Sequence, residues 1–153
     1  MTVSIDRQQN GWRGAGLALS IGLALSLASI AGLLVDQMSV HSLSDHVRAQ
    51  YSPYGEVPDP NVLFVYLYMT AGLGVVAWLI ALRGARRRKP WVPWLAGMTF
   101  VVGATLAVFN LVITEHGTQI FPVLWSLLGL LPSVAGLIGV ILLWTHTGSR
   151  ARP

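Results

Sequence analysis

The chain has 153 residues, of which 54% are hydrophobic and only 10% are charged, and its formal net charge is +4. A soluble domain of this size cannot bury so large an apolar fraction, so the composition excludes an ordinary water-soluble globular protein. The sequence contains no cysteine, which excludes disulfides, thiolate metal sites and enzymes that use a redox-active thiol pair.

Long apolar runs occur at four places, and the only charged residue in them is Arg13, at the edge of the first. The runs are residues 12–35, 62–82, 91–114 and 119–144. A helix of about 20 residues crosses the ~30 Å hydrocarbon core of a bilayer, and none of the runs alternates as a membrane strand does. The sequence therefore predicts an all-α membrane protein, a single domain over residues 1–153 whose four transmembrane helices form an antiparallel up-down bundle.

The first run has two interpretations. Arg7 and Arg13 precede it, and "SIA" before Gly32 has the small-x-small form of a signal-peptide cleavage site. The run is, however, longer than the roughly 15 residues of a signal-peptide core and continues to Val35, which favours a retained helix. Small residues recur in it every four positions, so we expect it to pack closely at the centre of the bundle. The two ladders are Gly14, Ala18, Gly22, Ser26 and Ser20, Ala24, Ala28, Gly32.

The long connection, residues 36–61, is predicted to be an outer loop with two halves. The first half is compatible with an extension of the first helix or with a short interfacial helix, for which Ser44 is a possible cap. In the second half, Pro53, Gly55, Pro58 and Pro60 predict an extended, turn-rich return to the second span.

The distribution of charge predicts the orientation of the helices. The stretch "RGARRRKPW" at residues 83–91 falls between the second and third spans, and basic residues near span ends stay in the cytoplasm. With both termini cytoplasmic, Arg48 is the only one of the 10 lysine and arginine residues outside, and Asp6 the only one of the 6 acidic residues inside. The basic stretch then lies against anionic lipid headgroups, and so short a turn does not predict nucleic-acid binding. Tryptophans, Trp78 among them, are expected at the inner interface.

Within the spans, two residues are candidates for a ligand pocket. Asn110 is the only amide side chain well inside a span, and we expect it to form an interhelical hydrogen bond. Pro132 removes one backbone hydrogen bond from the fourth span and should kink it. No ionisable side chain lies deep in a span, which argues against proton-coupled transport, and no histidine does, which argues against haem. We therefore predict no cofactor.

A looser candidate site lies in the outer loops. His41 and Asp45 would share a helix face if their segment is helical, and His116 could add a third metal ligand from the turn between the third and fourth spans. Glu115 and His46 are nearby in the same loops. The spacing matches no metal signature, so the competing interpretation is that these are solvated loop residues.

The stretch "VFNLVITEHGTQIFPVLWSLLGLLPSVAGLIGVILLW", together with the four-span layout, resembles small DoxX-like bacterial inner-membrane proteins. The resemblance implies a multi-pass location in the bacterial inner membrane and carries over no catalytic residue.

Two functions follow as hypotheses. The first is a non-enzymatic accessory or partner-binding bundle, whose partners are the lipid bilayer and other membrane proteins. The alternative is a membrane enzyme or binder of a lipophilic small molecule that enters between helices near Asn110 and Pro132.

The predicted orientation can be tested because the parent chain has no cysteine. A cysteine introduced by Ser52→Cys should react with a membrane-impermeant thiol reagent on intact cells. A cysteine introduced by Ser149→Cys should react only after the membrane is opened. The reverse pattern would contradict the orientation.

Overall fold

The computed structural model describes residues 2–55, 58–115 and 117–147, with side chains from residue 14 to residue 145 outside the two gaps. His116 and Ser149, both used above, lie outside the described residues. Within these residues, four helices are long and apolar enough to cross a membrane. They are α1 (Thr2–Val35), α3 (Asn61–Arg86), α4 (Val92–Val112) and α5 (Val123–Thr147). The predicted all-α four-helix bundle is confirmed, and its helices are compatible with a multi-pass membrane protein.

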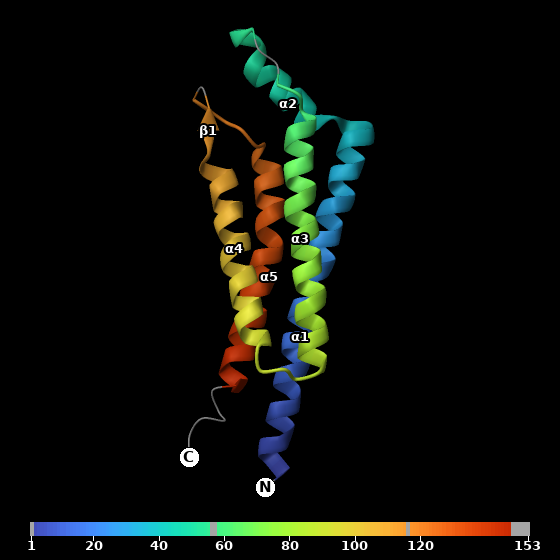
Figure 1. Ribbon diagram of the computed structural model, residues 1–153, viewed down its shortest axis with the longest axis vertical. Coiled ribbons are helices and arrows are strands. Elements are labelled where there is room, and N and C mark those ends of the chain that lie inside the picture. Colours follow the sequence, from blue (N-terminus) through green and yellow to red (C-terminus); the bar gives the residue numbers. More distant parts are fainter. Residues whose placement is uncertain (1, 56–57, 116, 148–153) are drawn as a thin grey trace.

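The long helices run up and down, so that consecutive helices are antiparallel (Figure 1). The start of α1, the turn between α3 and α4 and the end of α5 lie at one end of the bundle. This is called the basic end, because its turn holds Arg86, Arg87, Arg88 and Lys89. The opposite end is called the α2 end, after the short helix α2 (Ser42–Tyr51) that lies there. α1 packs mainly against α5 and α3, and α5 packs against α1 and α4, so the central position expected of the first helix is shared with α5.

At the α2 end, α1 continues without a break into one π-helical turn, η1 (Asp36–Val40). The helix stops at His41, which has a left-handed backbone with φ 60°. The buried Asp36 carboxylate then caps α2, because it accepts hydrogen bonds from the backbone N–H groups of Ser42 (2.9 Å) and Leu43 (3.1 Å) and from the Ser42 hydroxyl. The cap is therefore Asp36 and not Ser44, which lies inside α2. A 3₁₀ turn, η2 (Ser52–Tyr54), follows α2.

The third and fourth spans are shorter than their apolar patterns indicated. α4 ends at Val112, and α5 begins only at Val123. Between them, β1 (Thr114–Glu115) and β2 (Thr118–Gln119) form a small antiparallel hairpin. Gly117 makes this turn possible because its φ of 81° suits a residue without a Cβ atom. Pro122, which lacks a backbone N–H, directly precedes α5.

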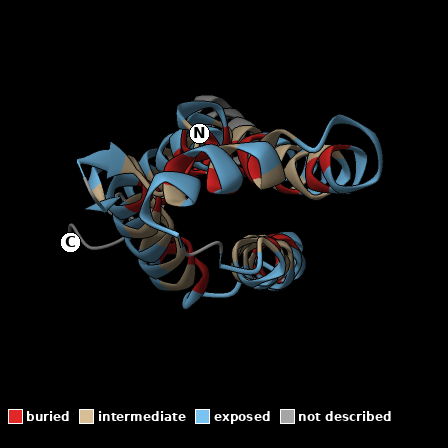
Figure 2. Cartoon of the chain, turned by 90° about the horizontal axis from the view of Figure 1, so that it is seen from above, coloured by how far each residue is buried: buried red, intermediate tan, exposed pale blue. Residues whose placement is uncertain are grey.

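Side chains pack in two separate clusters, one toward each end of the bundle. Exposed residues cover the outside, and buried ones face between the helices (Figure 2). The cluster at the basic end is the larger: Ala15, Leu19, Trp78, Ala81, Leu82, Ala85, Val92, Ala96 and Leu143. The cluster at the α2 end is smaller: Leu33, Leu43, Phe64 and Trp125. The middle of the bundle has no such cluster of buried residues within the described chain.

Trp78 joins three helices in the larger cluster. It projects from α3, is only 3% exposed, and lies against Gly22 of α1 and Gly136 of α5. A Cβ atom added to Gly136 would lie 2.6 Å from Trp78 Cη2, and one added to Gly22 would lie 3.1 Å from Trp78 Cε2. Trp78 thus lies toward the basic end, as expected, but its ring packs between helices and is not on the outer surface. The two glycines provide the space in which its ring packs.

We predict that Gly136→Ala lowers stability by about 1–3 kcal/mol, because the new methyl group overlaps the Trp78 ring. Gly129→Ala in the same helix is the matched control, since its Cβ would meet nothing within 4 Å. The control should be neutral or should gain up to about 1 kcal/mol from alanine's higher helix propensity. Thermal unfolding in mild detergent measures both. Equal melting temperatures for the two variants would contradict the tight packing of Trp78.

Candidate functional site

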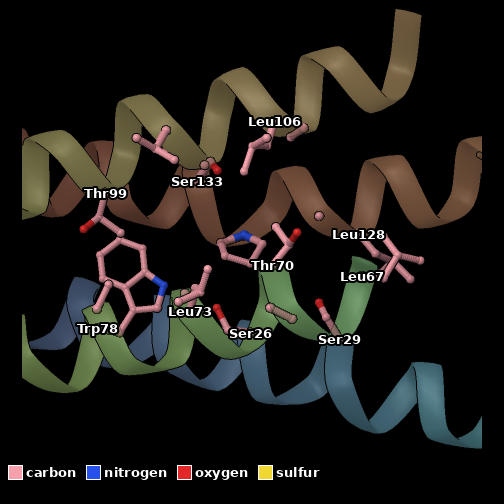
Figure 3. Close-up of a pocket in the computed structure, with 18 of the residues that line it drawn as sticks. Ser26, Ser29, Leu67, Thr70, Leu73, Trp78, Thr99, Leu106, Leu128 and Ser133 are labelled. Atoms are coloured by element: carbon pink, nitrogen blue, oxygen red, sulfur yellow. The ribbon is translucent and has the colours of Figure 1, made fainter. Parts of the chain in front are cut away.

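A cavity of about 430 Å³ lies between the two packed clusters. All four long helices contribute to its wall, with α1 and α3 on one side and α4 and α5 on the other (Figure 3). Trp78 of the larger cluster and Trp125 of the smaller one both line it. Its volume falls within the usual range of small-molecule sites, roughly 300–1,000 Å³. The bundle is thus tightly packed toward its ends and hollow between them.

The exposure of its wall residues indicates that the cavity opens sideways, between α3 and α4. These two helices touch where Gly84 meets Trp91 and Val92 at the basic end, and the Tyr66 hydroxyl bonds to Asn110 toward the α2 end. The helix between Tyr66 and Gly84 is about 27 Å long. Near the midpoint of this segment, the wall residues Leu73 of α3 and Val102 of α4 are 68% and 57% exposed.

Most polar side chains in the wall are already hydrogen-bonded within their own helices. The hydroxyl groups of Ser26, Ser29, Thr70 and Thr99 each donate to the backbone carbonyl four residues earlier, at 2.9–3.0 Å. Such bonds satisfy the hydroxyl hydrogen without help from another helix. These four residues therefore make the wall behave as a nearly apolar surface.

Asn110, one of the two pocket candidates from the sequence, lines the cavity and is 7% exposed. The expected interhelical hydrogen bond is present, because the Tyr66 hydroxyl of α3 donates to Asn110 Oδ1 at 3.0 Å. The Ser126 hydroxyl of α5 donates to the Asn110 backbone carbonyl at 3.2 Å. Three helices therefore hold Asn110 in place. Its side-chain NH₂ group donates to no residue in the described part of the chain.

Pro132, the second candidate, also lines the cavity, inside the continuous helix α5. It has no backbone N–H, so the carbonyl group of Leu128, another wall residue, lacks its usual helical donor.

Two further polar groups, which the sequence did not single out, belong to the same wall. Ser133 is 5% exposed and Trp78 is 3% exposed. Among the described residues, neither the Ser133 hydroxyl nor the Trp78 indole N–H has a hydrogen-bond partner. The indole nitrogen of Trp78 faces the cavity (Figure 3). Trp125 differs, since its N–H donates to Ser42 Oγ at 3.4 Å. In the sequence, the feature that could have identified Ser133 as a wall residue was its position directly after Pro132. Trp78 was instead interpreted as an aromatic residue of the membrane interface.

The outer polar residues do not gather into a metal site within the described residues. No three His, Asp or Glu side chains there could hold an ion together, and His116 lies outside the described chain. The left-handed residue His41 separates η1 from α2, and Asp45 is exposed on α2. His46 instead points to the hairpin, with Nε2 2.9 Å from the backbone oxygen of Gln119.

These contacts dock α2 onto the β1–β2 hairpin. Gln50 Nε2 donates to the backbone oxygen of Glu115 at 3.2 Å, and the Tyr51 hydroxyl donates to the Glu115 carboxylate. Together with the Asp36 cap, they hold α2 at its end of the bundle. The outer residues therefore have a structural role that the spacing of the sequence did not reveal.

The Tyr51–Glu115 contact raises the pKa of Tyr51 from 10.0 to about 12, mainly through the hydrogen bond to Glu115, with burial and the carboxylate charge adding to it. Because the folded pKa is raised, the contact stabilises the docked α2 fully below pH 10 and is lost as the pH rises through about 12. Glu115→Gln should therefore shift one tyrosine titration back toward pH 10. Ultraviolet absorbance of tyrosinate measures this, and Tyr51→Phe identifies the signal. A titration curve unchanged by Glu115→Gln would contradict the contact.

Comparison of this chain with protein-family models, curated proteins and solved structures gives no match. Function is therefore inferred from the geometry of the cavity.

Proposed function

We propose that this protein is a multi-pass protein of the bacterial inner membrane, with both termini in the cytoplasm, that binds a lipophilic small molecule inside its helical bundle. The observation that carries the proposal is the cavity of about 430 Å³ and its opening between α3 and α4. Leu73 and Val102, at this opening, lie near the middle of their helices. In a bilayer the opening would therefore face the hydrocarbon core, from which an apolar molecule can enter.

Among the described residues, packed contacts cover the bundle at the α2 end. The Asp36 cap and the bond from Trp125 to Ser42 tie η1, α2 and α5 together, and Leu43 of α2 is fully buried in the cluster beneath. A ligand that reaches the cavity is thus taken from the membrane. This favours a lipophilic ligand over a water-soluble one.

An accessory, partner-binding bundle is the other expectation, and its support came from the ladders of small residues. The ladder of α1 that starts at Gly14 is already used inside this chain. Gly22 packs on Trp78. A Cβ atom added to Gly14 would lie 3.5 Å from Leu142 Cδ1. The second ladder is exposed at Ser20, Ala24 and Ala28, but no described residue shows what would cover it. Binding in the cavity, which has a defined wall and volume, is therefore the function that the geometry supports best.

Photolabelling tests the proposal. The probe is a long-chain alkane carrying a diazirine, added to membranes that contain the protein, and the labelled peptides are mapped by mass spectrometry. We expect labelling of α4 and α5 wall residues that excess unlabelled competitor suppresses. Labelling of the lipid-facing surface should not saturate, so competition separates the cavity from the surrounding bilayer.

A matched pair of variants locates the site. Gly129→Phe places a large ring in the cavity wall, whereas Gly97→Phe adds the same ring on α4 outside the wall, and a Cβ meets nothing within 4 Å at either position. Gly129→Phe should abolish the saturable labelling and Gly97→Phe should retain it. Labelling that no competitor reduces, or that is the same in both variants, would contradict binding in the cavity.

A further inference from the structure

The geometry points to an uncharged ligand that carries an oxygen acceptor, such as a carbonyl group, on an elongated apolar body. This inference rests on the proposed binding function and names the chemical class of the ligand. A molecule that moves from lipid into this cavity exchanges one apolar environment for another. It therefore gains little from the hydrophobic effect, and hydrogen bonds and shape must select it.

The wall offers hydrogen-bond donors that nothing else in the described chain uses. They are the Asn110 NH₂ group, the Ser133 hydroxyl and the Trp78 indole N–H, all on residues at most 7% exposed. These donor atoms are open to the cavity, since Gln50 Oε1 is the only fully buried side-chain N or O atom without a partner among the described residues. When an apolar molecule fills the cavity, each donor left unpaired costs about 1–3 kcal/mol. Indole N–H and amide NH₂ groups can only donate. The complementary ligand group is an acceptor, which excludes a plain hydrocarbon as the best fit.

The donors are spread along the cavity. Asn110 is joined to Tyr66 of α3, and Trp78 follows Tyr66 twelve positions later in the same helix, which is about 18 Å along its axis. Ser133 lies between these levels, because a Cβ on Gly103 of α4 would be 3.1 Å from its hydroxyl oxygen. An elongated molecule thus meets donors at both ends and a mostly apolar wall between them.

The ligand carries no charge. The wall contains no Asp, Glu, Lys, Arg or His side chain that could balance one. An unpaired charge in such surroundings is strongly disfavoured and would be neutralised or left in water. A fatty acid in its ionised form is therefore excluded, whereas a ketone or an ester of similar length fits.

Three competitors of equal chain length test this class in the photolabelling experiment: a long-chain methyl ketone, the matching alkane and the matching carboxylate. The ketone should suppress labelling at a roughly three- to tenfold lower concentration than the alkane, as one or two net hydrogen bonds would allow. The carboxylate should be the weakest. Equal competition by the ketone and the alkane would overturn the inference while leaving cavity binding intact. Absence of saturable labelling would instead overturn the proposed function.

A pair of variants assigns the preference to Asn110. Asn110→Leu removes its donors, and Tyr66→Phe removes the same Tyr66–Asn110 bond but keeps the donors. The ketone should lose its advantage in Asn110→Leu and keep most of it in Tyr66→Phe. Loss in both variants, or in neither, would contradict the role of the amide.

The acceptor could belong to a bilayer lipid, through its ester carbonyl, or to a free lipophilic molecule. Vesicles of ether-linked lipids, which have no ester carbonyl, separate the two sources. If the ketone competes more strongly there than in ester-linked vesicles, bilayer esters occupy the same site. If its potency is unchanged, the occupant is a free molecule, and both results agree with the inferred class.

Discussion

The packing of Trp78 against glycine is the contact on which the rest of the bundle depends. Lipid is as apolar as leucine, so helices in a membrane associate only where their surfaces fit closely. Here Gly22 of α1 and Gly136 of α5 provide the space, and α3 fills it with one large ring. This fixes α3 mainly against α1, less closely against α4, and lets its Trp78 ring reach α5. The helices α3 and α4, which the short basic turn joins, therefore pack on each other less closely than α3 packs on α1, although they are neighbours in sequence.

The cavity follows from this arrangement. At the basic end the Trp78 ring fills the space between helices, and at the α2 end Trp125 does the same beneath the docked helix α2. Between these two levels the facing residues include Gly74, Gly103 and Gly129, which are too small to meet across the bundle. The hollow is thus a consequence of where large and small residues fall. Unpartnered donors in its wall then turn an empty space into a site that can distinguish one apolar molecule from another.

The sequence predicted the architecture because apolar run length and charge asymmetry act over whole helices. Four spans, their alternation and the central place of α1 required no knowledge of individual contacts. Asn110 and Pro132 stood out because polar and imino residues are rare in spans, and both line the cavity. The burial of Trp78 was not predicted, since it depends on Gly136 in a helix far along the chain. The Asp36 cap and the hairpin depend likewise on turns, which apolar periodicity does not encode.

A crystal structure of the protein grown from a lipidic mesophase tests the central claim most directly, because the bundle is then surrounded by lipid. The account predicts elongated density between α3 and α4 that does not belong to the chain. Its oxygen should lie within about 3.2 Å of Asn110 Nδ2. A structure in which α3 packs onto α4 along its full length, closing the space between Trp78 and Asn110, would contradict the account.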